Sequence, residues 1–363
     1  MIEQVCIRNY KSIKDANVKL GPLNVLIGSN GVGKSNFISF FELVNAILNK
    51  RLGSYVVKRG GFDRFLYQGQ KHSKSMDALI DFANTNAFFF RLKPTIENKA
   101  YIDCSGDFFN TRKEQTKNYK NLWNRTLWDN AVEESGILES REWRAKYLRD
   151  FLNSFIVYHF QDTSIASSMR AECNIGDNMA LRHDASNLAA YLFRLQNNEP
   201  QSFKLIEGVI RSIVPYFKGF ILRENPNKQG YITLEWEERD SDTYLDANSF
   251  SDGTLRFIAL ATLLLQPNLP DTIIIDEPEL GLHPTAINKF AAMVRRASQK
   301  AQIILATQSV NLVNCFEPED IIVVDRKENQ TVFNRLDKEM LSVWLEEYNI
   351  GDIWEKNIIG GQP

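Results

Sequence analysis

The segment that most restricts the fold of this chain is residues 28–35, which read GSNGVGKS. It matches the phosphate-loop pattern G-x-x-x-x-G-K-[ST] at every fixed position. The short apolar run at 24–28 predicts a buried strand before the loop, and apolar residues at helical spacing predict a helix after it. The pattern is informative in this strand-to-helix context, which disfavours a chance glycine turn. We therefore expect the loop to bind a nucleoside triphosphate.

The residue types of the loop suit a phosphate ligand. Its glycines let successive backbone N–H groups point at phosphate oxygens, and the start of the following helix adds partial positive charge. Lys34 would reach the β- and γ-phosphates, and the Ser35 hydroxyl would ligate Mg²⁺. The residues that we expect to contact the nucleotide are Asn30, Gly31, Val32, Gly33, Lys34, Ser35 and Asn36.

A second chemical signal is the acidic end of an apolar run at 272–278, TIIIDEP. The run predicts a buried strand that ends in two carboxylates. Behind a phosphate loop, Asp276 at this point would hold Mg²⁺, and Glu277 would polarise the attacking water as a general base. Taken alone, the segment could be a strand with solvated acids at its end. The phosphate loop elsewhere in the chain favours the catalytic interpretation.

The two halves of the chain carry different secondary-structure patterns. In the C-terminal half, strands are expected at 272–275, 302–306 and 321–326. Helices are expected at 255–265 and 284–298, so strand and helix alternate and predict a largely parallel sheet. Short strand patterns dominate the N-terminal part. We therefore expect an α/β protein with a mixed sheet and a β-rich N-terminal lobe.

Composition excludes several classes of protein. The 363 residues carry a formal net charge of −2, which argues against a protein that coats DNA with a strongly basic surface. The longest apolar run, at 257–265, is too short to span a membrane, and the N-terminus lacks a signal-peptide core. Cysteine and histidine show no zinc-ligand spacing. We expect a cytoplasmic protein that contacts no membrane and holds no zinc.

Residues 111–155 differ from the rest, because they are rich in Lys, Arg, Glu, Asn and Trp. We interpret them as a helical insertion. Nine basic and six acidic residues lie between Arg112 and Arg149, interleaved with Trp and Tyr. Such a surface could bind nucleic acid through phosphate contacts and stacking. A small helical subdomain with a Trp core is the simpler explanation, and a protein-docking surface is equally compatible.

Four motifs together, GSNGVGKS, FSDGTLRF, IIIDEPELGLHP and ATQS, resemble those of the ABC-type ATPases of the SMC/RecF/OLD group. The chain looks most like the short, stand-alone RecF-like "AAA family" ATPases of prokaryotes. The resemblance implies a P-loop NTPase fold of the ABC/SMC-head type. It divides the chain into an N-terminal ATPase lobe at 1–110, the insertion at 111–155, a Q-loop segment with a helical region at 156–230, and a C-terminal ATPase lobe at 231–363.

The resemblance also implies roles for residues outside the phosphate loop. Ser251, Asp252 and Gly253 match the signature motif, which contacts the nucleotide bound by a partner subunit. Gln161 matches the glutamine that senses Mg²⁺ and the γ-phosphate. Gln308 occupies the switch position, where many ABC ATPases carry His. Glutamine can still position a phosphate or a water but carries no charge, so we expect slow turnover.

The implied function is Mg²⁺-dependent ATP hydrolysis by a head that dimerises around ATP and separates after hydrolysis. Relatives of this group suggest a switch in DNA maintenance or phage defence that acts with a separately encoded effector. Two alternatives stay open. One is an ATP-binding regulatory module with little turnover that assembles a nuclease or toxin. The other is a transporter cassette, which the wide separation of the phosphate loop from the acidic strand disfavours.

Overall fold

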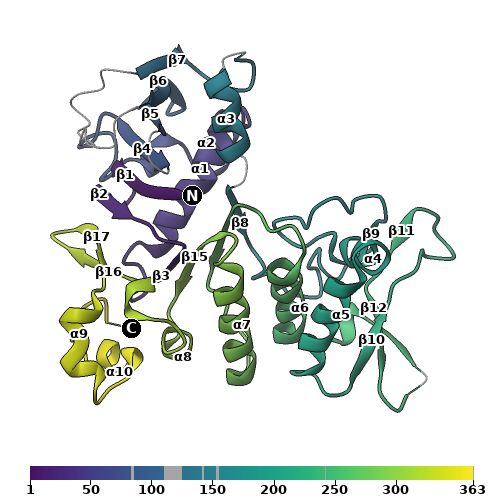
Figure 1. The fold of residues 1–363 in the computed structure, drawn as a ribbon. Coiled ribbons are helices and arrows are strands. Elements are labelled where there is room, and N and C mark those ends of the chain that lie inside the picture. Colours follow the sequence, from purple (N-terminus) through teal and green to yellow (C-terminus); the bar gives the residue numbers. More distant parts are fainter. Residues whose placement is uncertain (83–85, 110–124, 141–142, 153–154, 242, 363) are drawn as a thin grey trace.

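The computed structural model describes residues 1–362 except 83–85, 110–124, 141–142, 153–154 and 242. Figure 1 shows two sheets joined through helix α1 and a separate lobe of short strands and helices at the right. The N-terminal sheet lies at the top of the view, and the C-terminal helices lie at the lower left. The phosphate loop lies where the two sheets meet, because the strand before it belongs to one sheet and α1 packs on both.

The N-terminal sheet is antiparallel, with the strand order β2-β1-β4-β5-β6-β7. Its strands are β1 (Ile2–Tyr10), β2 (Ile13–Lys19), β4 (Met76–Phe82), β5 (Asn86–Pro94), β6 (Ala100–Phe109) and β7 (Arg125–Val132). Apolar residues of β5 such as Phe88 and Phe90 bury the face that packs on the helices of this lobe. An antiparallel sheet needs cover on one face only, which suits strands that alternate apolar and polar residues.

Helix α1 (Lys34–Leu48) lies between the two sheets. Phe40 stacks on Phe90 of β5 with ring centroids 6.2 Å apart, and Phe41 meets Phe155 of the second sheet edge-on at 6.0 Å. The helix is therefore apolar on opposite faces, and most of its residues are buried. Two further helices of this lobe are α2 (Leu52–Lys58) and α3 (Trp143–Leu152), and a 3₁₀ turn, η1 (Phe62–Phe65), follows α2.

The second sheet has the strand order β17-β16-β3-β15-β14-β8 and is parallel except for the β16–β17 pair. Its strands are β3 (Leu23–Ile27), β8 (Phe155–Tyr158), β14 (Thr272–Asp276), β15 (Gln302–Thr307), β16 (Ile321–Lys327) and β17 (Gln330–Arg335). Along these strands, alternate residues point to opposite faces of the sheet. One face packs on α1, and the other packs on α6 (Asp252–Leu265) and α7 (Pro284–Ala297). Since β3, β8, β14 and β15 run parallel, their carboxyl ends meet along one edge of the sheet.

The lobe at the right of Figure 1, called the right-hand lobe below, is formed by the segment between β8 and α6. Its elements are β9 (Cys173–Asn174), α4 (Leu188–Asn198), α5 (Pro200–Arg211), β10 (Phe217–Ile221), β11 (Tyr231–Ile232), β12 (Glu235–Glu238), β13 (Tyr244–Asp246) and η2 (Ala247–Ser249). The C-terminal part adds α8 (Val310–Val313), η3 (Pro318–Asp320), α9 (Lys338–Leu345) and α10 (Ile350–Glu355). Helices α5 and α6 pack on each other, so this lobe shares the core of the second sheet.

The expected helical insertion at 111–155 needs correction. Residues 125–132 form strand β7, which pairs with β6 and extends the N-terminal sheet. Only 143–152 within this segment is a described helix, and 110–124 lie outside the described residues together with much of the basic surface expected there. The long-range pairing with β6 explains the strand, because β propensity depends on cross-strand neighbours that the local sequence does not show.

The boundary expected at 230/231 falls inside the right-hand lobe. Strand β10, before the boundary, pairs with β12, after it, and β9 pairs with β11 in the same way. The strands on both sides of residue 230 therefore belong to one small unit inserted between β8 and α6.

Candidate nucleotide-binding site

The phosphate loop connects β3 to α1, as its pattern predicts. Gly31 and Gly33 have φ angles of 79° and 120°, in a region that L side chains rarely adopt. A Cβ atom on Gly33 would also collide with the Thr331 side chain of β17. Both glycines are therefore needed for the curl that turns backbone N–H groups toward a ligand at the start of α1.

Lys34, the first residue of α1, is turned back onto the loop. Its ammonium group donates to the carbonyl oxygens of Gly28 at 2.5 Å and Ser29 at 2.9 Å, and the residue is 5% exposed. Burial lowers the pKa of Lys34, and the nearby carboxylates of Glu277 and Asp276 oppose this shift. The cation thus lies between the phosphate loop and the acidic strand end.

Asp276, the last residue of β14, has the features of a magnesium ligand. Burial raises the pKa of its carboxyl, and a hydrogen bond with Ser35 lowers it in part. Its Oδ1 atom is buried without a hydrogen-bond partner, which is costly unless a ligand compensates. One carboxylate and one hydroxyl are a typical protein contribution to Mg²⁺, which takes its other ligands from phosphates and water. The residues present therefore fit the metal.

Glu277 follows Asp276 in a strained backbone conformation. Its φ angle is 47°, and its N–H donates to the Ala306 carbonyl at 2.8 Å. A non-glycine residue in the left-handed region persists only where its surroundings enforce it, and such residues are frequent at functional sites. The Glu277 carboxylate accepts a hydrogen bond from the Gln308 amide, so the expected base and the expected switch residue are in contact.

Glu279 is a site residue whose contacts the sequence did not reveal. It is 9% exposed, and one carboxylate oxygen accepts from the Thr307 hydroxyl at 2.5 Å and from the Gln308 N–H at 3.1 Å. Its second oxygen is buried without a hydrogen-bond partner, and burial raises the pKa of the carboxyl. Glu279 therefore holds the backbone of the switch segment from which Gln308 reaches Glu277.

Gln161 lies three residues beyond β8 and donates its side-chain amide to the Asp276 carbonyl at 3.1 Å. Arg256, from the first turns of α6, fixes this segment. Its guanidinium donates to the Phe160 carbonyl at 2.9 Å and the Gln161 carbonyl at 2.7 Å. The glutamine is thus placed at the acidic strand end by a residue of the signature helix.

The signature residues begin α6 and are exposed or half-buried. Ser251 caps the helix, with its hydroxyl accepting from the Thr254 N–H at 3.2 Å. Gly253 lies against the backbone of Gly281, in the loop that follows the acidic strand end, so closely that a Cβ atom would collide with the Gly281 carbonyl. The signature loop therefore touches the acidic segment without entering the phosphate loop.

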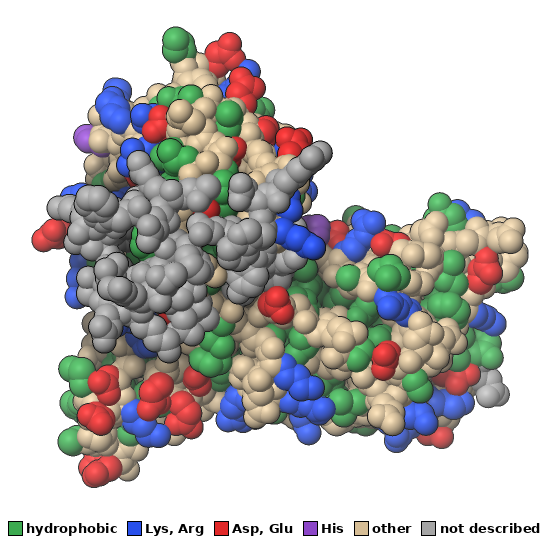
Figure 2. Space-filling model, turned by 45° about the horizontal axis from the view of Figure 1, so that its top comes forward, with side chains coloured by type: hydrophobic (Ala, Val, Ile, Leu, Met, Phe, Trp, Pro, Cys, Tyr) green, Lys and Arg blue, Asp and Glu red, His purple; other side chains and the backbone are tan. Residues whose placement is uncertain are grey.

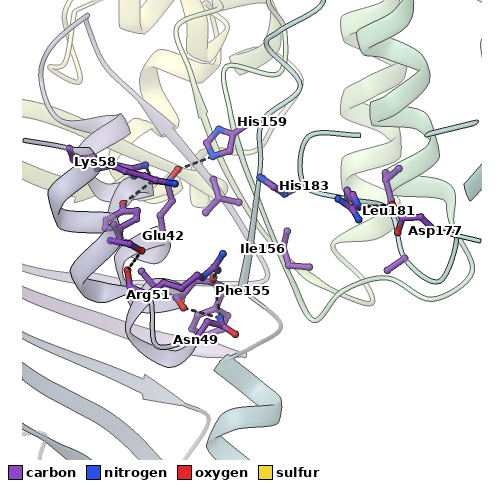
Figure 3. A pocket seen from close by; sticks show the side chains of 18 of the residues that line it. Glu42, Asn49, Arg51, Lys58, Phe155, Ile156, His159, Asp177, Leu181 and His183 are labelled. Atoms are coloured by element: carbon purple, nitrogen blue, oxygen red, sulfur yellow. Dashed lines mark hydrogen bonds and ion pairs between the residues drawn. The ribbon is translucent and has the colours of Figure 1, made fainter. Parts of the chain in front are cut away.

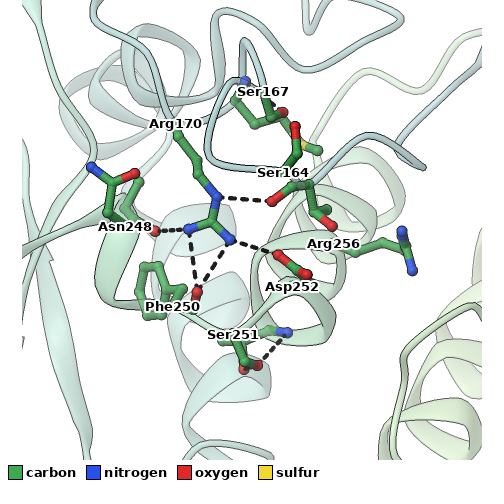
Figure 4. A network of polar contacts seen from close by, with 12 residues as sticks. Ser164, Ser167, Arg170, Asn248, Phe250, Ser251, Asp252 and Arg256 are labelled. Atoms are coloured by element: carbon green, nitrogen blue, oxygen red, sulfur yellow. Dashed lines mark hydrogen bonds and ion pairs between the residues drawn. The ribbon is translucent and has the colours of Figure 1, made fainter.

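A buried arginine, Arg170, holds the signature loop in place (Figure 4). It is 8% exposed, and its guanidinium donates to the Thr163 carbonyl at 2.9 Å, the Phe250 carbonyl at 3.2 Å and the Asp252 carboxylate at 2.8 Å. A further bond reaches the Ala247 carbonyl. Arg170 comes from the segment that follows Gln161, whereas Arg256 comes from the signature helix. Arg170 thus holds the signature loop, and Arg256 holds the segment that carries Gln161. We call these two arginines and their contacts the reciprocal clamp.

The sequence-predicted residues thus fall into two groups. The first group lies at the carboxyl ends of β3, β8, β14 and β15 and consists of the phosphate loop, Gln161, Asp276, Glu277 and Gln308. The second group, Ser251, Asp252 and Gly253, lies at the start of α6. In the described part of the chain, no hydrogen bond joins residues 251–253 to the phosphate loop. The structure thus places the phosphate loop beside the acidic strand end and keeps the helix start at 251–253 apart from the loop.

Comparison with known proteins gives the family of the chain. Residues 23–314 match the family described as "AAA domain, putative AbiEii toxin, Type IV TA system". The chain belongs to this family. It is an ATPase of the SMC and OLD type. The matched range, residues 23–314 of this chain, includes every site residue described above.

Two relatives of the AAA-domain chain cover most of its length. It is 22% identical to the Old nuclease of Escherichia phage P2 over 91% of the chain, and 22% identical to the OLD nuclease of Thermus scotoductus over 92%. The chain spans only 60% and 64% of those two proteins. A shorter match, 32% identical over 29% of the chain and 39% of the relative, is to the energy-coupling factor transporter ATP-binding protein EcfA2 of Halalkalibacterium halodurans.

Solved structures show the same fold. An SMC head bound to the C-winged helix domain of ScpA aligns over 93% of the chain and 99% of its own length, with a TM-score of 0.59 and 16% identity. An SMC head with an extended coiled coil from Pyrococcus furiosus aligns over 95% and 98%, with a TM-score of 0.53 and 14% identity. The α/β ABC/SMC-head fold expected from the motifs is therefore confirmed.

Proposed function

We propose that the phosphate loop and the acidic strand end of this ATPase form one catalytic site for Mg²⁺-dependent ATP hydrolysis. The observation that carries the proposal is the meeting of Lys34, Ser35, Asp276 and Glu277 at one edge of the parallel sheet. Residues 30–36 would surround the phosphates through backbone N–H groups. Asp276 and Ser35 would hold Mg²⁺, which when bound neutralises charge that develops on the phosphates.

The roles of the side chains follow from their positions. Lys34 would leave the carbonyls of its own loop and donate to the β- and γ-phosphates. Glu277 would accept a proton from the attacking water. Gln308, which donates to Glu277, would keep that carboxylate oriented, and Gln161 would reach the metal and the γ-phosphate from the Asp276 carbonyl.

We further propose that two copies sandwich two ATP molecules. The signature residues Ser251, Asp252 and Gly253 are held rigidly at a helix start, yet they make no hydrogen bond to the phosphate loop of their own chain in the described residues. A Ser hydroxyl and helix N–H groups suit a γ-phosphate. A second copy related by twofold symmetry would present them to that phosphate, since such an interface pairs each surface with its complement twice.

The biological role that we propose is an ATP-driven switch in DNA maintenance or phage defence, acting with a separately encoded effector. Support comes from the description of the family, which names a toxin of a toxin–antitoxin system, and from the two OLD nucleases among the relatives. Closure around ATP and release after hydrolysis would change the surface available to that effector.

A second function, an ATP-binding module with little turnover, is favoured by one observation. The Glu277 carboxylate accepts a hydrogen bond from Gln308, which would restrain the base. A transporter cassette receives less support, because the match to EcfA2 covers 29% of the chain. No helix in the described part of the chain is long and apolar enough to cross a membrane.

The test is Glu277→Gln, which replaces the carboxylate base with an amide of the same shape. We expect ATP affinity to be retained, turnover to fall by about 10²–10⁴-fold, and a dimer to accumulate in size-exclusion chromatography with ATP and Mg²⁺. Glu238→Gln, at the half-buried end of β12 in the other lobe, is the matched control and should behave like the wild type. Wild-type turnover by Glu277→Gln would refute the base assignment. Near-zero turnover of the wild type with ATP-dependent dimers would favour the module.

A further inference from the structure

A groove lies between the N-terminal lobe and the segment after β8 (Figure 3). It has a volume of about 970 Å³, within the range of ligand-binding clefts. One wall comes from α1 and α2, the other from residues 177–183, and β8 forms the floor. Figure 2 shows the hollow between the two lobes, with histidine and basic side chains at its border. None of the roles proposed above uses these walls.

The walls of the groove carry more positive than negative charge. Its four Lys and Arg side chains face two acids, Glu42 and Asp177. Both acids are already paired, Glu42 with Arg59 at 2.6 Å and Asp177 with Arg182 at 2.6 Å. Arg51 and Lys58 form no ion pair with another described residue. The groove therefore has cations available for an acidic ligand.

The floor of the groove is the outer strand of a sheet. β8 pairs with β14 on one side, and no strand of the described chain pairs with it on the other. Just beyond β8, the His159 N–H donates to the His183 carbonyl at 2.8 Å, so a main-chain group next to this strand bonds to the segment that forms the opposite wall. The half-buried Ile156 and the apolar Leu181 border the same space. An uncovered strand edge is a template for an added strand.

We propose that this groove binds an extended acidic segment of a partner protein, which adds as a strand to the outer edge of β8. Main-chain hydrogen bonds to β8 would supply affinity. Carboxylates on one side of the segment would pair with Arg51 and Lys58, while alternate apolar side chains would pack against Ile156 and Leu181. The inference extends the proposed function, because it gives the separately encoded effector a place to dock.

An occupant of the groove would contact elements that lead to the nucleotide site. The imidazole of His159 lies 2.8 Å from the Glu42 carboxylate and so bridges β8 to α1, the helix that starts at the phosphate loop. Two residues after His159, Gln161 reaches the Asp276 carbonyl. A strand added to β8 would therefore lie beside the segment that carries Gln161 to the site.

A nucleic-acid strand is the main competing ligand, since phosphates also bind Arg and Lys. The strand edge and the apolar border favour a peptide, because a phosphodiester backbone cannot continue a β-ladder. The two ligands differ in a testable way, since only the peptide should depend on its own backbone N–H groups.

The experiment measures fluorescence anisotropy of labelled probes with the full chain and without nucleotide. The probes are a short peptide that alternates glutamate and valine, the same peptide N-methylated at alternate residues, and an oligothymidine of equal net charge. We expect the first peptide to bind, and both N-methylation and the double variant Arg51→Glu/Lys58→Glu to weaken it by about tenfold. The control Lys289→Glu/Lys300→Glu makes the same charge change on and just beyond α7 and should leave binding unchanged.

Three outcomes would overturn the proposal. They are no binding of the acidic peptide, equal binding of its N-methylated form, and tighter, Arg51- and Lys58-dependent binding of oligothymidine. The binding assay contains no nucleotide, so its failure is separate from a failure of the Glu277→Gln test. Conversely, a chain that forms no ATP-dependent dimer can still bind the peptide.

Discussion

The nucleotide half and the signature half of this ATPase are built in different ways. The phosphate loop, Asp276 and Glu277 lie at the carboxyl ends of parallel strands whose residues are buried on both faces. The signature residues lie at an exposed helix start that two arginines tie to neighbouring loops. The first half contains unpartnered buried oxygens that call for a ligand, at Asp276 and Glu279. In the second half, Ser251 and Asp252 are exposed although Ser251 bonds to Thr254 and Asp252 to Arg170.

Mixing two defective variants tests whether the phosphate loop of one chain works with the signature residues of another chain. Lys34→Ala should disable the phosphate loop, and Ser251→Arg should block the signature, each lowering ATP turnover about a hundredfold or more. A mixture should recover activity, because a mixed dimer pairs the intact loop of one chain with the intact signature of the other. Turnover of the mixture is compared with that of each variant alone. If the mixture stays inactive while mixed dimers form, the two halves do not meet across an interface.

Arg170→Met should disturb the signature half and leave ATP binding by the nucleotide half intact. It removes the buried donor to Thr163, Phe250 and Asp252, so we expect the free energy of unfolding to fall by about 3 kcal/mol. ATP binding should persist, since Lys34 and Asp276 are untouched, whereas turnover should fall. Chemical denaturation and nucleotide titration measure the two effects.

Arg194→Met is the control for Arg170→Met. Arg194 also donates to backbone carbonyls, those of Asn178 and Met179, but it does not touch the signature loop. Its replacement should leave turnover close to that of the wild type. Equal loss of turnover in both variants would mean that Arg170 has no special link to the signature.

Gln308→Ala sharpens the comparison within the nucleotide half. Without the amide, the Glu277 carboxylate loses its orienting hydrogen bond, and we expect kcat to fall by about tenfold with KM unchanged. Steady-state kinetics separates the two parameters, and Gln308→His shows whether an imidazole can replace the amide. A rise in kcat for Gln308→Ala would instead identify Gln308 as a restraint on the base.

Glu279→Gln should produce the smallest effect, visible in the pH dependence of stability. Burial raises the pKa of Glu279 above its usual 4.5, so the folded protein retains this proton to a higher pH than the unfolded chain. Its contribution is full below the unfolded pKa and is lost as pH rises through the folded pKa, so stability falls with rising pH. Glu279→Gln still accepts from Thr307 and should flatten that fall in denaturation curves between acidic and neutral pH. An unchanged slope would mean that folding does not raise the pKa of Glu279.

The sequence predicted the parts of this molecule whose signals are local. The phosphate loop, the strand that ends at Asp276, and helices α6 and α7 lie where their patterns placed them. Each depends on residues that are close in the sequence, such as the glycine spacing of the loop or a run of aliphatic residues. The fold class followed from the alternation of strand and helix patterns in the C-terminal half.

Other parts depend on contacts between distant segments and were missed. Strand β7 exists because β6 lies beside it, and the right-hand lobe crosses residue 230 because β10 pairs with β12. Arg170 stands in no motif and meets its partners only after folding. Arg256 and Glu279 did lie inside the matched motifs, where an arginine on an apolar helix and an acid after a buried strand were the available signals.

The reciprocal clamp has a consequence for how the chain can be lengthened. Arg170 and the loop at 247–252 hold together the two ends of the segment that forms the right-hand lobe. Closing a longer segment between ends that are already fixed adds little entropic cost, because that cost grows only slowly with length. Residues added within the loops of the lobe should therefore disturb the ATPase little, whereas removal of α5 would expose the face of α6 on which it packs. The clamp thus lets the lobe lengthen between two fixed ends.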